Sequence, residues 1–293
     1  MSRKNDSKEI VVRKVQFAFP EDFKPHWNAA KPELSQIFNS VSFMAPAFEP
    51  FIIDAVRAAA PYITDPDVKK EADGLSGQET QHYRQHRRFN AMLIAKGYEG
   101  LRAHEQQLEK DYAEIRKRPL KFQLAYAGGI ESLALAGGHM VVNLREYLFK
   151  DADPVGASLW LWHLMEEIEH KNAAFDVYQH VYGNYWYRLY GTAYAFIHVF
   201  RRMRQGYKIM LQADGLWGTW KTRWAIKQMA FRFWAYMLPQ IVRCAMPWHH
   251  PSRVADPAWM REWVARYDQG EKGLLTLDTT KLHLTSPVAV PAR

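Results

Sequence analysis

Residues 78–82 read QETQH and residues 166–170 read EEIEH, and each stretch contains the pattern Glu-x-x-His. The two pairs are Glu79 with His82 and Glu167 with His170. Both stretches lie in long segments of helical periodicity, where three positions turn the chain by about 300°. Each pair therefore shares one helix face to within about 60°, so its carboxylate and imidazole can reach one ion. A single pair is a weak signal, because Glu and His are common on helix surfaces.

Two further acids lie in apolar surroundings. Glu49 follows the run MAPAF at residues 44–48, and Glu131 lies in GGIESL at residues 128–133. A carboxylate buried in such a stretch costs several kcal/mol unless it is paired or binds a metal. In chain order the segments supply Glu, Glu-x-x-His, Glu and Glu-x-x-His, which is the ligand plan of ferritin-like dinuclear carboxylate proteins. Because Pro50 disfavours helical geometry at the preceding residue, Asp54 is the alternative to Glu49.

A third histidine is expected to join this set. His163 lies four positions before Glu167, so it shares a stripe with Glu167 and His170, although a core histidine is the alternative. His86 lies four positions after His82, where an outer contact or a solvated face is favoured over ligation. His139 lies about 80° from the direction of Glu131 and is a candidate to line the site.

Helical patterns dominate the chain. They cover residues 32–60, 65–96, 101–117, 119–150, 154–182, 185–212, 216–244 and 257–267. Asp65-Pro66 and Asp153-Pro154 each place a capping acid before a first-turn proline. The fold class predicted is all-α, a ferritin-like four-helix bundle with additional C-terminal helices. We expect a disordered arm at 1–10, the metal-binding bundle at 11–182, a basic aromatic helical extension packed on the bundle at 183–270, and an extended tail at 271–293.

The amino-acid composition indicates what kind of globular protein this is and where it is located. The 293 residues are 48% hydrophobic, which is enough for a sizeable core. The one cysteine, Cys244, excludes a disulfide within the chain and a cysteine-based zinc site. The opening MSRKNDSKEI has no apolar segment of the secretory type, and no run of 18 apolar residues follows it. We therefore expect a cytoplasmic protein, with peripheral contact at the inner membrane face as a variant of that expectation.

Positive charge and tryptophan concentrate in the C-terminal third. Residues 186–266 contain 13 Lys and Arg, 3 Asp and Glu, and 8 of the 11 Trp, while the whole chain has a net charge of +8. Such a surface suits anionic lipid or an acidic partner, and no motif indicates nucleic acid. Trp217, Trp220 and Trp224 form one helix stripe, which we expect to pack mainly on the bundle. The sequence leaves the oligomeric state open, with a homodimer as one alternative.

The chain resembles the bacterial predicted metal-dependent hydrolases over about residues 10–270. The resemblance is carried by QETQH at 78–82, HLMEEIEH at 163–170 and PWHHP at 247–251. The His-x-x-x-Glu-x-x-His stripe is also similar to the di-iron arylamine N-oxygenases. That resemblance implies seven metal ligands: Glu49, Glu79, His82, Glu131, His163, Glu167 and His170.

Two enzyme classes follow from a dinuclear site, and the catalytic residues beyond the metal ligands stay undefined. The favoured one is an O2-activating oxygenase or oxidase with two iron ions, a small hydrophobic organic substrate and an electron-donor protein. The alternative is a metal-dependent hydrolase that uses a metal-activated water, with manganese or zinc as further metals. Iron handling without catalysis is the least favoured. Small residues such as Gly129 and Gly138 near Glu131 leave room for substrate or serve close helix packing.

Overall fold

The structure, a computed structural model, describes residues 10–270 and 272–282, and this part of the chain contains helices and no strand. The all-helical prediction is thereby confirmed. In chain order the α-helices are α1 (Pro32–Ala59), α2 (Pro66–Ala95), α3 (Leu101–Arg116), α4 (Leu120–Phe149), α5 (Pro154–Glu169), α6 (Ala173–Val181), α7 (Tyr185–Ala213), α8 (Trp220–Ala245) and α9 (Ala258–Asp268). Three 3-10 turns accompany them at Ala60–Tyr62, Pro251–Arg253 and Lys272–Leu275.

The predicted helix starts are explained by local chemistry. Asp65 caps α2 by accepting hydrogen bonds from the backbone N–H groups of Asp67 and Val68. Asp153 caps α5 in the same way, through the N–H groups two and three residues on. A proline follows each capping acid at the first helical position, where its missing N–H is no loss. These caps fix where the two helices that carry the Glu-x-x-His pairs begin.

Helix α1 continues through two internal prolines, Pro46 and Pro50. Each proline removes one backbone hydrogen bond, and such a position would often kink or end a helix. Here the helix is held by burial, because most of its length packs against α2, α4 and α7. Glu49 therefore lies inside a continuous helix, and its side chain is completely buried.

One predicted helix is interrupted. We expected a single helix over 154–182, but α5 ends at Glu169 and α6 starts at Ala173. Between them, residues 170–172 form a turn in which the Ala173 N–H donates to the His170 carbonyl. The adjacent Lys171 side chain donates to the Val254 carbonyl, which ties this turn to the C-terminal segment. His170 thus follows the last helical residue of α5.

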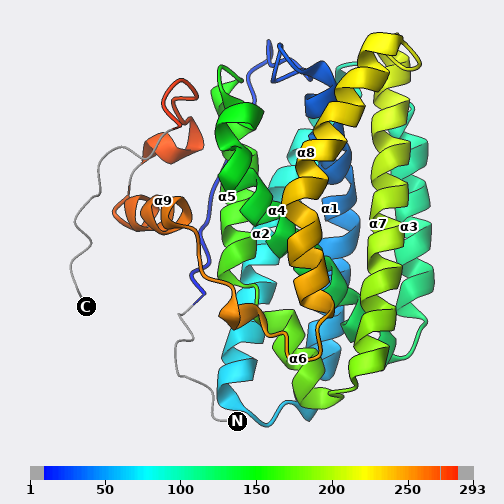
Figure 1. Cartoon of the computed structure of the whole chain (residues 1–293), viewed down its shortest axis with the longest axis vertical. Coiled ribbons are helices and arrows are strands. Elements are labelled where there is room, and N and C mark those ends of the chain that lie inside the picture. Colours follow the sequence, from blue (N-terminus) through cyan, green and yellow to red (C-terminus); the bar gives the residue numbers. More distant parts are fainter. Residues whose placement is uncertain (1–9, 271, 283–293) are drawn as a thin grey trace.

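Helices α1, α2, α4 and α5 run side by side, and α4 also packs along α7 (Figure 1). The buried apolar residues form two clusters, one toward each end of these helices. Polar side chains of the four helices lie between the clusters, and they are described in the next section. The packing therefore surrounds a polar centre with an apolar shell on both sides.

Close contacts between helices explain why some positions of α4 are occupied by small residues. A Cβ atom added at Gly129 would come within 2.7 Å of the Thr192 Cα of α7, and one at Gly138 would come within 2.8 Å of Ile168 of α5. At these two positions glycine serves close packing, which was one of the two alternatives from the sequence. Gly137 has no neighbour within 4 Å of an added Cβ.

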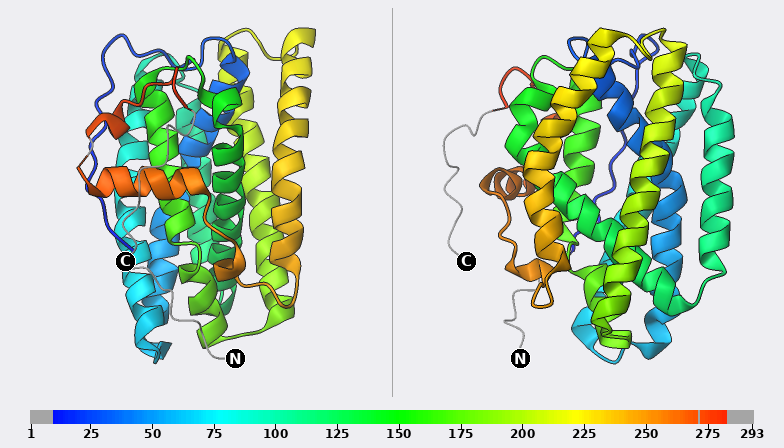
Figure 2. Two further views of the ribbon diagram at one scale, coloured as in Figure 1. Left: turned by 60° about the vertical axis from the view of Figure 1, so that its left-hand side comes forward. Right: turned by 45° about the vertical axis from the view of Figure 1, so that its right-hand side comes forward.

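The C-terminal helices give one correction. We expected the stripe of Trp217, Trp220 and Trp224 to pack mainly on the bundle, but Trp220 and Trp224 are 74% and 57% exposed. Helix α8 instead turns Met229 and Met237 inward, against α4 and α1. Figure 2 shows α8 on the outside of the molecule in both views. Trp217, which precedes α8, packs against the buried core as expected, whereas Trp220 and Trp224 face away from the bundle.

The two ends of the chain are described only in part. Residues 1–9 of the predicted arm and residues 271 and 283–293 of the predicted tail lie outside the described residues, while Ile10 packs against the buried core. Within the tail, Leu274 and Leu282 are buried, and the Leu277 N–H donates to the Ser158 hydroxyl of α5. Within residues 10–270 and 272–282, every helix is too short or too polar to cross a membrane.

Candidate metal centre

The structure brings together all seven residues that the sequence indicated. They come from α1 (Glu49), α2 (Glu79 and His82), α4 (Glu131), α5 (His163 and Glu167) and the turn after α5 (His170). They form two groups within which one side-chain donor atom of each residue lies within 4.8 Å of the others. One group is Glu49, His82 and His163, and the other is Glu79, Glu131, Glu167 and His170. We call these residues the seven-residue cluster.

The second group converges on one nitrogen atom. His170 Nε2 lies 3.0 Å from Glu167 Oε2, 3.2 Å from Glu131 Oε2 and 3.3 Å from Glu79 Oε1. Two ligand atoms that are each about 2.1 Å from one cation lie about 3 Å apart. Donor atoms from three helices and the turn therefore have the mutual spacing of ligands around a single ion.

Glu167 connects the two groups. Its Oε2 atom faces His170, while its Oε1 atom lies 3.1 Å from His163 Nε2 and 3.5 Å from His82 Nδ1. One carboxylate thus presents a different oxygen to each group. This is the arrangement in which a carboxylate bridges two cations.

Two of the buried carboxylates lack the hydrogen-bond donors that buried polar groups normally have. Glu49 and Glu79 are completely buried, and neither oxygen of either residue accepts a hydrogen bond. Burial, together with the negative charges of the other carboxylates, raises the pKa of both groups well above the ordinary value. An arrangement that leaves so many buried oxygens unpaired is costly. Two divalent cations would compensate the charge, so the donor set fits a dinuclear metal centre.

Outer hydrogen bonds orient two of the histidines. His82 directs Nε2 to Glu166 Oε2 at 3.0 Å, and Arg13 binds the other oxygen of Glu166 at 3.2 Å. His170 directs Nδ1 to Gln78 Oε1 at 2.9 Å. Because these carboxylate and amide oxygens accept, each imidazole donates from its outer nitrogen. The inner nitrogens face the cluster, as in metal-binding histidines. Burial lowers the pKa of both rings, but hydrogen bonds and the charges of the neighbouring carboxylates outweigh it and raise the pKa of His82 and His170 well above the ordinary value.

A chain of hydrogen bonds that begins beside Pro46 orients His163. Pro46 lacks the N–H that would bond the Ser42 carbonyl, and Asn90 Nδ2 donates to that carbonyl at 2.9 Å instead. Asn90 Oδ1 then accepts from the Ser42 hydroxyl at 2.6 Å, so the hydroxyl oxygen accepts from His86 Nδ1 at 2.8 Å. His86 Nε2 in turn accepts from His163 Nδ1 at 2.8 Å.

This chain of hydrogen bonds leaves His163 Nε2 without a proton. Burial and the neighbouring His82 lower the pKa of His163 to about 4, so the ring is neutral at pH 7. Its Nε2 lone pair nevertheless lies 3.1 Å from an oxygen of Glu167. Two acceptors at this distance repel each other unless a proton or a metal cation lies between them. The geometry therefore suits a ligand position for His163, which belongs to one of the two groups that could hold an ion.

Three residues considered in the sequence lie outside the cluster. Asp54 is exposed and pairs with Arg116 at 3.0 Å, so it is no substitute for Glu49. His86 makes an outer contact to His163. His139 lies elsewhere on α4, and burial and the charge of Lys171 lower its pKa.

Sequence reasoning missed the residues that support the histidines. Gln78 and Glu166 each directly precede the glutamate of a Glu-x-x-His pair. Their positions beside the pairs could have suggested a supporting role, but helical spacing alone did not predict it. Ser42, Asn90 and Arg13 carried none, because they are brought to the site by tertiary packing. Arg13 is separated from Glu166 by 153 residues, and it also pairs with Glu169.

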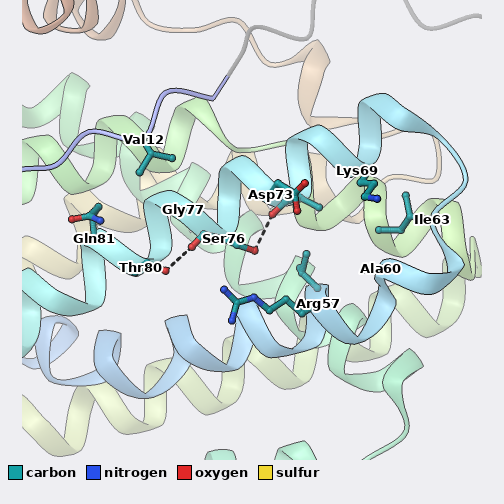
Figure 3. A pocket seen from close by; sticks show the side chains of 12 residues that line it. Val12, Arg57, Ala60, Ile63, Lys69, Asp73, Ser76, Gly77, Thr80 and Gln81 are labelled. Carbon is teal, nitrogen blue, oxygen red and sulfur yellow. Dashed lines mark hydrogen bonds between the residues drawn. The ribbon is translucent and has the colours of Figure 1, made fainter.

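A surface pocket lies near the cluster but apart from it. It has a volume of about 330 Å³ and lies between α1 and α2, with Arg57 on one wall and Lys69 on the other (Figure 3). Thr80 and Gln81 line it and directly follow Glu79 in the sequence. No member of the seven-residue cluster lines this pocket. The pocket and the cluster therefore use different faces of α2.

Comparison with known proteins gives one match. The model of a family described as predicted metal-dependent hydrolase matches residues 11–255. No curated protein and no solved structure is detectably similar to the chain. The matched range contains all seven residues of the cluster.

Proposed function

Because the chain belongs to the family of predicted metal-dependent hydrolases, we propose that it is a hydrolase whose seven-residue cluster binds two divalent cations. The observation that carries the proposal is the set of unpaired, completely buried carboxylates of Glu49 and Glu79, beside three histidines whose inner nitrogens face Glu167. Manganese, zinc and iron are all compatible with carboxylate and imidazole ligands. We also propose that α1, α2, α4 and α5 form a ferritin-like bundle around this centre.

The residues of the cluster have distinct roles in this proposal. A bound pair of cations supplies a water of lowered pKa and a positive charge that orients the substrate. Glu167 holds the two halves of the centre together because it faces both groups. His82, His163 and His170 stay in fixed orientations through their outer hydrogen bonds. The ring of Trp162 packs edge-on against His82, with ring centroids 4.9 Å apart, and shields that side from bulk water.

An O2-activating di-iron enzyme is the second candidate. The sequence favoured it, but the family description favours the hydrolase. The observation in its favour is the donor set itself, because four carboxylates with histidines between helices are typical of di-iron and di-manganese proteins. This candidate additionally requires an electron donor. Its substrate would be a small organic molecule.

Metal loading separates the two candidates. Metal-free protein would be loaded with Mn²⁺, Zn²⁺ or, without oxygen, Fe²⁺, and bound metal would be counted per chain. We expect two ions per chain and chelator-sensitive hydrolysis of p-nitrophenyl esters or phosphodiesters. Glu79→Gln should remove both, while Glu109→Gln, at an exposed position of α3, should change neither. Hydrolysis that survives chelation contradicts the proposal. O2 consumption and visible absorption by the Fe²⁺ form, without hydrolysis, identify the second candidate.

A further inference from the structure

The outward face of α8 carries a row of large apolar side chains. At 100° per residue, five positions of this helix point within about 40° of one another. Each of these residues is between 49% and 77% exposed. The row extends over 22 residue steps, or about 33 Å along the helix, and consists of Trp220, Trp224, Phe231, Leu238 and Val242. Contiguous exposed apolar surface of this kind marks an interaction site.

Helix α8 packs against the bundle through its opposite face. Met229, Met237 and Cys244 are buried on that face, where the helix packs against α4 and α1. Helix α8 lies on the outside of the molecule in each view (Figures 1 and 2). The apolar row is therefore a second apolar face, which the packing of the bundle does not use.

The charges beside the row all have one sign. Helix α8 contains five Lys and Arg residues, all exposed, and no Asp or Glu. Lys221 and Arg232 lie on one flank of the row, Arg223 lies on the other, and Lys227 lies within it. The neighbouring helix α7 also has no acidic residue. The face combines aromatic and aliphatic groups with positive charge only.

We propose that this face of α8 binds the surface of an anionic lipid bilayer. The apolar row would enter the layer of headgroups, where Trp side chains are favoured, while Lys and Arg face the lipid phosphates. The long stem of Lys227 allows its charge to reach the headgroups from within the row. The binding is peripheral, in keeping with the lengths and polarities of the described helices.

Charge argues against two other occupants. A second copy of the chain docked through the same face would set the five basic residues of one α8 against those of the other, without an acid on either helix. A nucleic acid would pair with the basic residues but would leave Leu238 and Val242 without an apolar partner. A bilayer with anionic headgroups satisfies both the charges and the apolar row.

Vesicle flotation tests this proposal with the full chain. Wild-type protein would be mixed with phosphatidylcholine vesicles that contain or lack phosphatidylglycerol, at low and at physiological salt. We expect binding to the anionic vesicles only, weakened by salt because screening shortens the reach of the charges. The double variant Trp224→Ser, Phe231→Ser should bind at least about tenfold more weakly. Tyr62→Ser removes an aromatic residue that is 61% exposed elsewhere, so it should bind as the wild type does.

Four outcomes would overturn the proposal. One is no binding to anionic vesicles at low salt, and a second is equal binding by the double variant while its circular dichroism shows a folded protein. A third is a dimer in light scattering that the double variant dissociates, which would make a second copy the occupant. A fourth is tighter binding to a DNA or RNA duplex than to anionic vesicles in the same buffer. None of these measurements depends on the metal centre.

Discussion

Replacing Glu49 with methionine should stabilise the metal-free protein. The Glu49 side chain is completely buried, and neither of its oxygens accepts a hydrogen bond. An unsatisfied buried polar group costs about 1–3 kcal/mol, and methionine removes it while keeping a similar length and flexibility. We therefore expect the free energy of unfolding of metal-free Glu49→Met to exceed that of the wild type by about 1–3 kcal/mol.

Added metal should make the wild type more stable than Glu49→Met. A cation at 100 times its dissociation constant adds about 2.7 kcal/mol to the stability of a protein that binds it only when folded. The wild type should show this gain, while Glu49→Met should lose most of it because one ligand of its group is missing. The two proteins would thus exchange rank when metal is added. Urea unfolding followed by circular dichroism, with chelator and with Mn²⁺, measures all four values.

A second glutamate of α1 provides the matched control. Glu33 is also buried, but its Oε1 atom accepts a hydrogen bond of 2.8 Å from the Thr222 hydroxyl. Glu33→Met should therefore destabilise the metal-free protein and leave the gain from metal unchanged. The reasoning on Glu49 is refuted if metal-free Glu49→Met is less stable than the wild type, or if it gains as much from metal.

Three further predictions concern packing, pH and the orientation of His163. Gly129→Ala should lower the unfolding free energy by about 1–3 kcal/mol because its Cβ would strike Thr192. Gly137→Ala, with no neighbour within 4 Å, should raise it by about 0.5–1 kcal/mol, and thermal unfolding compares the two. Burial opposes ionisation of Asp214, but hydrogen bonds from His26, Tyr98 and Gln36 outweigh it and hold the pKa of Asp214 below the ordinary value. Its contribution to stability is present above the unfolded pKa and disappears as the pH falls through the folded pKa, so urea unfolding should show wild type and Asp214→Asn converging in acid. His86→Leu removes the acceptor for His163 Nδ1 and should weaken metal binding about 10- to 100-fold in a chelator competition, and an unchanged affinity would show that His163 needs no such partner.

The parts that could be predicted are those with local causes. The capping acids Asp65 and Asp153 and the prolines after them act within one turn, so the starts of α2 and α5 can be derived from the sequence. The spacing of Glu79 and His82 is likewise a property of one helix, whereas His170 lies in the turn after α5. The order of the acids and histidines along the chain then indicated which helices meet, and the structure brings those residues together.

The parts that could not be predicted depend on distant contacts. Pro50 suggested a disturbed helix at Glu49, but tertiary burial keeps α1 continuous. The end of α5 before His170 has no proline or glycine signal, and the contact of Lys171 with residue 254 is not visible in the local sequence. Helical spacing revealed the stripe of Trp217, Trp220 and Trp224 but did not decide which of them faces the bundle, because α8 is apolar on both faces.

Anomalous diffraction from crystals of the manganese-loaded protein tests the central claim most directly. If the seven-residue cluster is a dinuclear centre, two anomalous peaks should appear about 3.5–4 Å apart between α1, α2, α4 and α5. Glu167 should lie between the peaks, with one oxygen toward each. The absence of a peak among these residues in crystals that hold manganese elsewhere would contradict the account. A single peak bound by only one of the two groups would contradict its dinuclear form.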